Sequence, residues 1–267
     1  NTFYFTLFIV KTSVDVGIGY TDPSEKLDVN GNIKFNGKIY TNGSTATGTK
    51  SIAIGNSNEA SGNYSVALGE QNRASNDYSV ALGRSTASGK YSVALGLRNR
   101  VSGFGAFAMG GYTDVTDPTT KENELNKATA RNSAAIGLGN SANGEESVAR
   151  GHYNTSIGEA AVAMGRLNKS NKDSSVAMGE NNTANGEAAV AIGENNTADG
   201  KYSVAIGYAN TLNGYAHGAI AMGIGSVATW VGSIAIGGTF KRDENDDHLL
   251  GQVDDDTRNT ADGDGCI

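Results

Sequence analysis

The sequence repeats a short motif at an almost constant interval, and this period limits the folds that the chain can adopt. The pentapeptide SVALG occurs at 65–69, 79–83 and 92–96. Its closing glycine serves as a marker for thirteen copies of the motif, and successive markers are most often fourteen positions apart, with single intervals of thirteen, sixteen and twenty-seven positions. The markers are Gly55, Gly69, Gly83, Gly96, Gly110, Gly137, Gly151, Gly165, Gly179, Gly193, Gly207, Gly223 and Gly237. Such a period predicts one structural unit per repeat, stacked on its neighbours.

The residues before each marker alternate between bulky and small. Alanine stands two positions before every marker, and serine or alanine stands four positions before it. The position three before the marker is apolar, and the position one before it is Ile, Leu or Met in every copy except Arg150. This alternation predicts a strand whose bulky face fills a core and whose small face lets neighbouring backbones approach. The repeat residues that should carry this structure include Ala53, Gly55, Ala67, Gly69, Ala81, Gly83, Ala191 and Gly193.

The second half of the unit predicts turns and a second strand. Asparagine lies three residues after nine of the markers, alanine often lies five after them, and glycine often lies seven after them. Asn and Gly tolerate left-handed backbone conformations. Each unit is therefore interpreted as strand, turn, short strand and turn, which is one coil of an all-β parallel solenoid with 14-residue coils. Stacked coils would place the recurrent asparagines in a ladder of side-chain amides.

Composition indicates that one chain supplies little bulky material for a core. Glycine accounts for 37 of the 267 residues, and hydrophobic residues account for 38%. Several chains lying side by side and sharing a core would compensate for this shortage. The net charge is -7, and no basic stripe marks a surface for nucleic acid. We therefore expect no nucleic-acid partner.

The repeats carry a family resemblance. The segment SIAIGNSNEASGNYSVALGEQNRASNDYSVALG (51–83) resembles the head repeat of trimeric autotransporter adhesins, the YadA-like heads, whose unit is close to SVAIGxxNxAxGxx. The resemblance covers 51–237. It implies a left-handed parallel β-roll, a homotrimeric fibre and binding to host surfaces or matrix. The solenoid follows from the period, whereas the handedness and the number of three chains follow from the resemblance alone.

A second resemblance lies upstream. The segment VGIGYTDPSEKLDVNGNI (16–33) is similar to a segment of phage tail-fibre proteins and related bacterial fibres. It suits a trimeric shaft that leads into a head. No neck motif or heptad stalk is recognised, so we expect either an excised head or another kind of fibre.

These patterns predict three parts. Residues 1–50 form a β-rich shaft or connector, 51–237 form the head repeats, and 238–267 form an acidic tail. The apolar start, NTFYFTLFIV, resembles part of a signal peptide but lacks the basic start and the small-residue cleavage site, and ten residues cannot span a bilayer. A strand or the boundary of a fragment is therefore favoured over a targeting remnant. In the tail, 243–247 resembles the start of a calcium loop, but His248 stands where an EF-hand needs glycine. A solvated tail is therefore favoured over a calcium site.

Departures from the repeat are the candidate binding sites, because irregular segments on a regular scaffold often carry specificity. The longest interval between markers, from Gly110 to Gly137, contains an insertion at 111–131, and Pro118 with a polar composition favours a loop over a degenerate coil. This loop is interpreted either as a binding segment or as a decoration that the solenoid tolerates. Arg150 occupies a position that the pattern directs into the core, which predicts either an ion or polar site between chains or a locally hydrated coil. The candidate ligand-binding residues are Tyr112, Asp114, Asp117, Lys121, Glu122, Arg150 and His152.

The sequence favours recognition over catalysis. Its three histidines are scattered, and no catalytic, metal or cofactor motif is recognised. We therefore expect no enzyme activity, no cofactor, no metal and no membrane insertion by this segment. The predicted function is that of an extracellular, cell-surface, homotrimeric fibre that acts as an adhesin head and binds a host-surface protein or glycan. The alternatives are a virion tail-fibre receptor-binding protein and a purely structural surface fibre.

Overall fold

The chain divides into two units, Asn1–Lys38 and Ile39–Ile267. The computed structural model describes residues 43–111, 125–238 and 260–261 in full and, in addition, the backbone of β1 (Phe8–Val10), β2 (Val16–Ile18), β3 (Leu27–Val29), β28 (Phe240–Arg242) and β29 (His248–Val253). In the first unit, β2 pairs with β1 in the antiparallel sense and with β3 in the parallel sense. In the second unit, β28 and β29 pair in the antiparallel sense.

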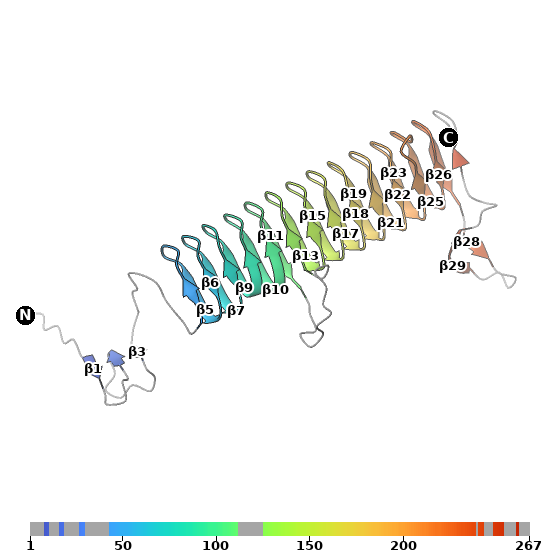
Figure 1. Cartoon of the computed structure of the whole chain (residues 1–267). Coiled ribbons are helices and arrows are strands. Elements are labelled where there is room, and N and C mark those ends of the chain that lie inside the picture. Colours follow the sequence, from blue (N-terminus) through green and yellow to red (C-terminus); the bar gives the residue numbers. More distant parts are fainter. Residues whose placement is uncertain are drawn as a thin grey trace, which may run out of the picture. The chain divides into compact units, whose positions relative to one another are not determined.

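The other described residues of the second unit form a parallel solenoid of thirteen long strands, each continued by a short strand in the other sheet (Figure 1). The long strands are β5 (Ile52–Asn56), β7 (Val66–Glu70), β11 (Phe107–Gly110), β13 (Ala134–Leu138), β15 (Val148–His152), β17 (Val162–Arg166), β19 (Val176–Glu180), β21 (Val190–Glu194), β23 (Val204–Tyr208), β25 (Ile220–Ile224) and β27 (Ile234–Gly237). The short strands are β4 (Thr45–Ala46), β6 (Glu59–Ala60), β8 (Arg73–Ala74), β12 (Lys127–Ala128), β14 (Ser141–Ala142), β16 (Thr155–Ser156), β18 (Lys169–Ser170), β20 (Thr183–Ala184), β22 (Thr197–Ala198), β24 (Thr211–Leu212), β26 (Val227–Ala228) and β30 (Thr260–Ala261). In two coils, β9 (Val80–Ala87) and β10 (Val93–Val101) run through both positions.

Equivalent residues of successive repeats lie directly beside one another. Ala53 pairs with Ala67, and Ala67 pairs with Ala81, in an unbroken parallel register. The same register joins the long strands from β11 to β27. The predicted parallel solenoid is therefore confirmed, with one sequence repeat in each coil.

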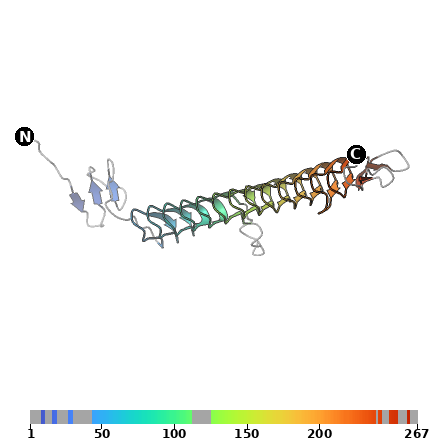
Figure 2. The ribbon, with the colours of Figure 1, turned by 90° about the horizontal axis from the view of Figure 1, so that it is seen from above.

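The interior of the coils contains mostly small side chains, although Val101 and Leu212 are fully buried at short-strand positions. Ala53, Ala67, Ala81 and Ala191 have no exposed surface, and neither do the alanines of the short strands, such as Ala60. Figure 2, turned by 90°, shows how narrow the coils are in this direction. Two sheets this close leave room for alanine and serine, and for asparagine at the turn, but for few larger side chains.

This narrow interior reverses the predicted orientation of the strands. Ala67 is fully buried, whereas its neighbours Val66 and Leu68 are half-buried and lie on the outside of the coil. The prediction that Val and Leu of SVALG fill a core is therefore wrong within one chain. The small face meets the other sheet of the same chain, and the bulky face points away from it.

The predicted asparagine ladder is confirmed. Asn168 is fully buried, and its Nδ2 donates hydrogen bonds to Asn154 Oδ1 at 3.0 Å, to the Met164 carbonyl at 2.9 Å and to the Gly179 carbonyl at 2.6 Å. Its Oδ1 accepts hydrogen bonds from the backbone N and the Nδ2 of Asn182, both at 3.0 Å. The ladder consists of Ser44, Asn58, Asn72, Ser85, Asn99, Asn126, Asn140, Asn154, Asn168, Asn182, Asn196, Asn210 and Ser226.

The marker glycines are required by both conformation and space. Gly165 has a φ of +115°, and a Cβ there would lie 2.1 Å from the carbonyl oxygen of Gly179. Gly55, Gly69, Gly83 and Gly193 have φ values between +96° and +118°. The ladder asparagines, in contrast, do not have a left-handed backbone conformation. The residue before each asparagine usually has it instead, such as Asn181, which precedes Asn182 and has a φ of 53°. The prediction that the recurrent asparagine occupies a left-handed turn position is therefore wrong, because the residue before it occupies that position.

The irregular intervals have simple structural causes. The longest interval is a single coil, because β12 pairs with both β10 and β14 and Asn126 continues the ladder. Residues 125–131, which the sequence assigned to the insertion, therefore belong to the coil. The coils also extend beyond 51–237, because β4 pairs with β6 before the first marker and β30 pairs with β26 after the last one.

The ladder predicts the effect of substituting one of its members. Asn168→Ala removes three donated and two accepted hydrogen bonds from a buried position and should lower the free energy of unfolding by about 2–4 kcal/mol. Asn168→Ser should lower it by roughly half as much, because Ser85 already holds a ladder position through its hydroxyl, which donates to the Gly96 carbonyl at 2.7 Å. Chemical denaturation at one protein concentration measures both. Equal losses for the two variants would contradict the role of the ladder.

Candidate functional site

The insertion leaves and rejoins the solenoid at one turn of the coil. Gly111 is the last described residue before it, and Leu125 is the first after it. In the next coil only two residues, Leu138 and Gly139, separate the marker glycine from the ladder asparagine. The insertion therefore replaces a two-residue turn and leaves both strands of its coil in register. The candidate residues Tyr112, Asp114, Asp117, Lys121 and Glu122 lie outside the described residues and stay predictions.

A cavity of about 280 Å³ begins where the insertion rejoins the coil. Leu125 and Lys127 line it on one side, and Ser141, Tyr153 and Thr155, from the following two coils, line it on the other. Tyr153 also stacks on the exposed ring of His152, with 4.4 Å between the ring centroids. The structure thus brings the end of the insertion close to the His152 region, two segments that the sequence singled out separately.

Arg150 lies on a different surface. It is exposed on β15, and its register neighbours are Ile136 and Met164. The sequence pattern directed it into the core, but within this chain the whole column of bulky residues faces outward, so that Arg150 needs no buried partner. Its place between two apolar side chains instead interrupts the outer apolar face with a positive charge.

The outer face of the long strands is apolar over the length of the solenoid. Two columns of side chains form it, one and three residues before each marker, and they are half-buried or exposed in every coil. Ile54 is 42% exposed, Met109 43% and Ile236 61%. The outer face of the short strands, in contrast, bears mostly polar residues, such as Arg73, Thr183 and Thr197. A long exposed apolar stripe of this kind, interrupted by a charge only at Arg150 among the described coils, is typical of an interface with another protein surface.

A second stack of aromatic rings lies at the opposite turn, and the sequence analysis did not identify it. The rings of Tyr64, Tyr78 and Tyr91 are stacked with 5.0 Å between centroids, and Phe104 meets Tyr91 edge-on at 5.3 Å. The tyrosines stand five residues before their markers, so the same self-comparison that found SVALG contained the signal. The three tyrosine rings pack face to face, and each of the four aromatic residues is 44–48% exposed.

Some of the charged residues form local pairs between neighbouring coils. Lys201 Nζ lies 2.9 Å from Glu187 Oε2, and the hydrogen bond and the charge of Glu187 raise the pKa of Lys201. The backbone N of Lys201 donates to Nδ1 of His217 at 3.0 Å. Among residues 43–111 and 125–238, no group of three His, Cys, Asp or Glu side chains is placed to hold a metal ion. The predicted similarity of 243–247 to a calcium loop lies outside the described residues.

The geometry of the described coils favours binding over catalysis. It offers apolar, aromatic and charged columns, and its two described histidines, His152 and His217, are engaged in ring stacking and in a backbone hydrogen bond. In the part of the chain that the structure describes, no helix has the length and apolar character needed to cross a membrane.

Comparison with protein-family models matches the chain to the YadA head domain repeat (2 copies). The matched segments are 42–58, 46–69, 60–86, 84–99, 128–153, 156–182, 184–210 and 216–238. Together they cover more than half of the chain, and they omit the coil that carries the insertion. The resemblance of 16–33 to tail-fibre segments stays a prediction. A comparison with curated proteins finds no match.

The aromatic stack predicts a difference between two equivalent tyrosines. Tyr78 stacks between two rings, whereas Tyr202 has the same left-handed backbone but lies between coils that place Ala188 and Gly218 at this position. Tyr78→Ala should therefore destabilise the chain by about 1–2 kcal/mol more than Tyr202→Ala. The free energies of unfolding of both variants measure this difference. If the two losses are equal, the stack contributes nothing to stability.

Proposed function

This chain belongs to the YadA head repeat family, and from that premise we propose that three copies assemble into an extracellular fibre that attaches its bearer to host surfaces. Heads of this family are trimeric, non-enzymatic adhesin domains exposed at the cell surface. The chain is accordingly a structural recognition domain and not an enzyme. Our proposal adds the surface through which the chains assemble and the segment through which they recognise a ligand.

The observation that supports assembly is the apolar outer face of the long strands. Each coil contributes two outward side chains, usually Val, Ile, Leu or Met, and full burial of such a side chain contributes about 1.5–3 kcal/mol. These side chains are only half-buried in the single chain, so that much of this energy becomes available when a second surface covers them. Three copies packed through these faces would share one apolar core, and the polar faces of their short strands would lie outside.

Arg150 has a distinct place in this proposal. Covered by neighbouring chains, its guanidinium would lie among apolar side chains, where a charge needs a partner or water. Three symmetry-related arginines would then form a polar layer inside the trimer that holds an anion or water. This agrees with the alternatives that the sequence left open for this residue.

We assign ligand recognition to the insertion and to the adjoining cavity beside Tyr153. The regular coils present the same side chains again and again, whereas the insertion interrupts them once, next to His152 and Tyr153. Binding of a host-surface protein or glycan there would use Tyr112, Asp114, Asp117, Lys121 and Glu122 together with His152.

The assembly proposal predicts the mass of the chain in solution. Light scattering should give three times the chain mass of 27.5 kDa. Met178→Glu with Ile192→Glu places two like charges in adjacent coils of the apolar face and should reduce the mass towards that of a single chain. Thr183→Glu with Thr197→Glu makes the same change in charge on the opposite sheet and should leave the mass unchanged. A wild-type chain that is monomeric and folded would refute the assembly proposal.

The recognition proposal predicts the effect of removing the insertion. Residues 111–125 are replaced by Leu-Gly, the pair that joins the same two positions in the next coil, so that Asn126 and β12 keep their places. The trimer mass should not change, whereas attachment to host cells should fall severalfold. A deletion of 111–131 would be a poor substitute, because it removes a member of the ladder and a strand. Full attachment by the Leu-Gly variant would place recognition elsewhere on the fibre.

A further inference from the structure

We propose that a groove over the coils of β8, β9 and β10 binds a linear, sulfated glycan through four arginines. Arg73, Arg84, Arg98 and Arg100 line a cavity of about 370 Å³ that ends at Leu125. None of the described residues that line it carries a carboxylate or an aromatic ring. In a chain whose net charge is -7, this concentration of guanidinium groups is a local exception.

The shortest interval between markers, from Gly83 to Gly96, builds the groove. Leu97 pairs with Arg84 and Arg100 pairs with Thr86, so that two residues of β10, Arg98 and Asn99, stand opposite one residue of β9. This register shift arises because a single residue, Arg84, separates the marker Gly83 from the ladder residue Ser85, whereas two residues separate them in the next coil. Arg98 has a φ of 53°, the left-handed conformation that is usual before a ladder asparagine, and it is half-buried with its side chain lining the groove.

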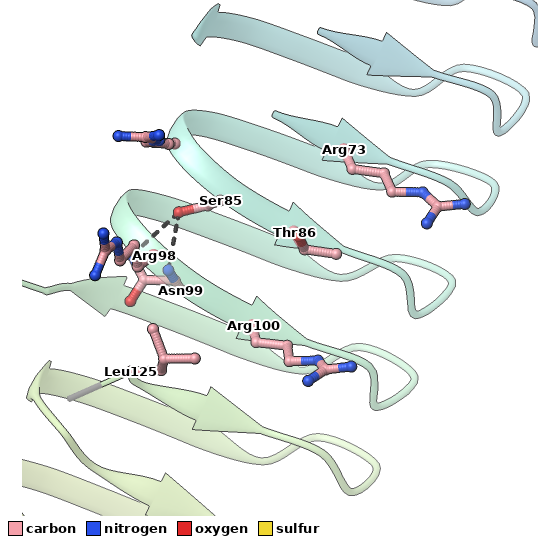
Figure 3. A pocket seen from close by; sticks show the side chains of 8 residues that line it. Arg73, Ser85, Thr86, Arg98, Asn99, Arg100 and Leu125 are labelled. Carbon is pink, nitrogen blue, oxygen red and sulfur yellow. Dashed lines mark hydrogen bonds between the residues drawn. The ribbon is translucent and has the colours of Figure 1, made fainter. Parts of the chain in front are cut away.

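The arginines lie along two rims with a polar floor between them. Arg73 and Arg100 both pair with Thr86, which places them two strands apart, at about 10 Å. Figure 3 shows Thr86 between Arg73 and Arg100, whose side chains extend in the same direction, while Arg98 lies farther along the same coils, beside Ser85. An elongated ligand could therefore lie over Thr86 and present acidic groups to both rims.

The positive charges of the groove are only partly compensated. Arg73 Nε lies 3.3 Å from Glu59 Oε2, and Arg84 Nε donates to Gln71 Oε1 at 2.8 Å. Arg98 and Arg100 form no ion pair with another described residue. Like charges on adjacent strands repel one another, and an anionic ligand that bridges them would relieve this repulsion.

The shape and chemistry of the groove favour a sulfated glycan. The planar guanidinium group binds tetrahedral oxyanions through two parallel hydrogen bonds, and sulfate groups along a sugar chain supply such anions at regular intervals. The cavity beside Tyr153 shares Leu125 with the groove and adds Lys127, so that the path continues along the solenoid, as a linear ligand requires. Single-stranded nucleic acid is disfavoured over the groove itself, because none of the described residues that line it is aromatic and bases would have no platform on which to stack.

The inference rests on the proposed attachment function in one respect, because the fibre would encounter a sulfated glycan at the host surface to which it attaches. The binding itself follows from the arginines of the groove and requires neither the insertion nor any cell. The experiment is therefore carried out in solution, and its failure would leave attachment through the insertion untouched.

The test measures binding of the full chain to a fluorescent heparin-derived octasaccharide. Arg98→Gln with Arg100→Thr is the informative variant, because Gln71 and Thr86 already occupy these two coil positions nearby and the fold should tolerate them. It should weaken binding tenfold or more, since each change removes a charge-assisted contact. Lys169→Thr with Lys172→Gln removes the same charge from distant coils and should change affinity less than twofold. Circular dichroism confirms that both variants are folded.

Two further probes define the ligand class. A hyaluronan octasaccharide, which carries carboxylates but no sulfates, should bind at least tenfold more weakly than the heparin octasaccharide. Raising the salt concentration should weaken heparin binding steeply, as expected when several charges are neutralised. Equal loss in the two double variants, or no binding by the wild-type chain, would overturn the proposal. A single-stranded oligonucleotide of equal charge that binds more tightly than heparin would overturn the choice of ligand class.

Discussion

The structure depends on how closely the two sheets of each coil approach. Four inward positions per coil fill the space between them: serine or alanine and then alanine in the long strand, asparagine or serine at the turn, and most often alanine in the short strand. Burial of alanine supplies little transfer energy, because that energy scales with the apolar area removed from water. Backbone pairing between coils and the amide ladder must supply most of the cohesion within one chain. The ladder is suited to this role, because each amide satisfies the carbonyl of a marker glycine in the following coil and also links two neighbouring asparagines.

The narrow interior also explains why the chain has an apolar exterior. The long strands contain two classes of side chain, and the larger class lies outside the narrow interior, where Val101 and Leu212 are the larger apolar side chains that the described short strands bury. Val, Ile, Leu and Met are therefore placed on the outside, where they gain full burial only by contact with another surface. In most folded domains the largest apolar residues fill the core, but here most of them lie on the outer face of the long strands. Arg150 is tolerated in this column because the single chain does not enclose it.

The sequence predicted the period, the strands and the ladder, because each depends on spacing along the chain. It did not predict which strand face lies inside, since alternation with a period of two is the same whichever face is buried. That choice depends on the width of the coil, which no single repeat reveals. The sequence did not identify Asn126 as a member of the ladder, because the insertion separates it from its marker, Gly110, and so removes it from the usual spacing. The cluster of Arg73, Arg84, Arg98 and Arg100 was hidden for a related reason, because stacking joins residues that are one or two coils apart in sequence.

A solenoid of identical coils presents the same chemistry at every step, so that a ligand gains no preference for one position over the next. Specific recognition requires a coil that differs from its neighbours. The short coil at Ser85 and the long interval after Gly110 are such departures, and they lie close together on the same part of the solenoid. Both preserve the ladder: Ser85 Oγ donates to the Gly96 carbonyl at 2.7 Å and accepts from the backbone N of Asn99 at 3.1 Å, and Asn126 Nδ2 donates to Asn99 Oδ1 at 3.0 Å. Coil length can therefore vary at this turn as long as the side chain of the ladder residue donates to the carbonyl of the next marker glycine. The outer surface can then carry binding groups without loss of the fold.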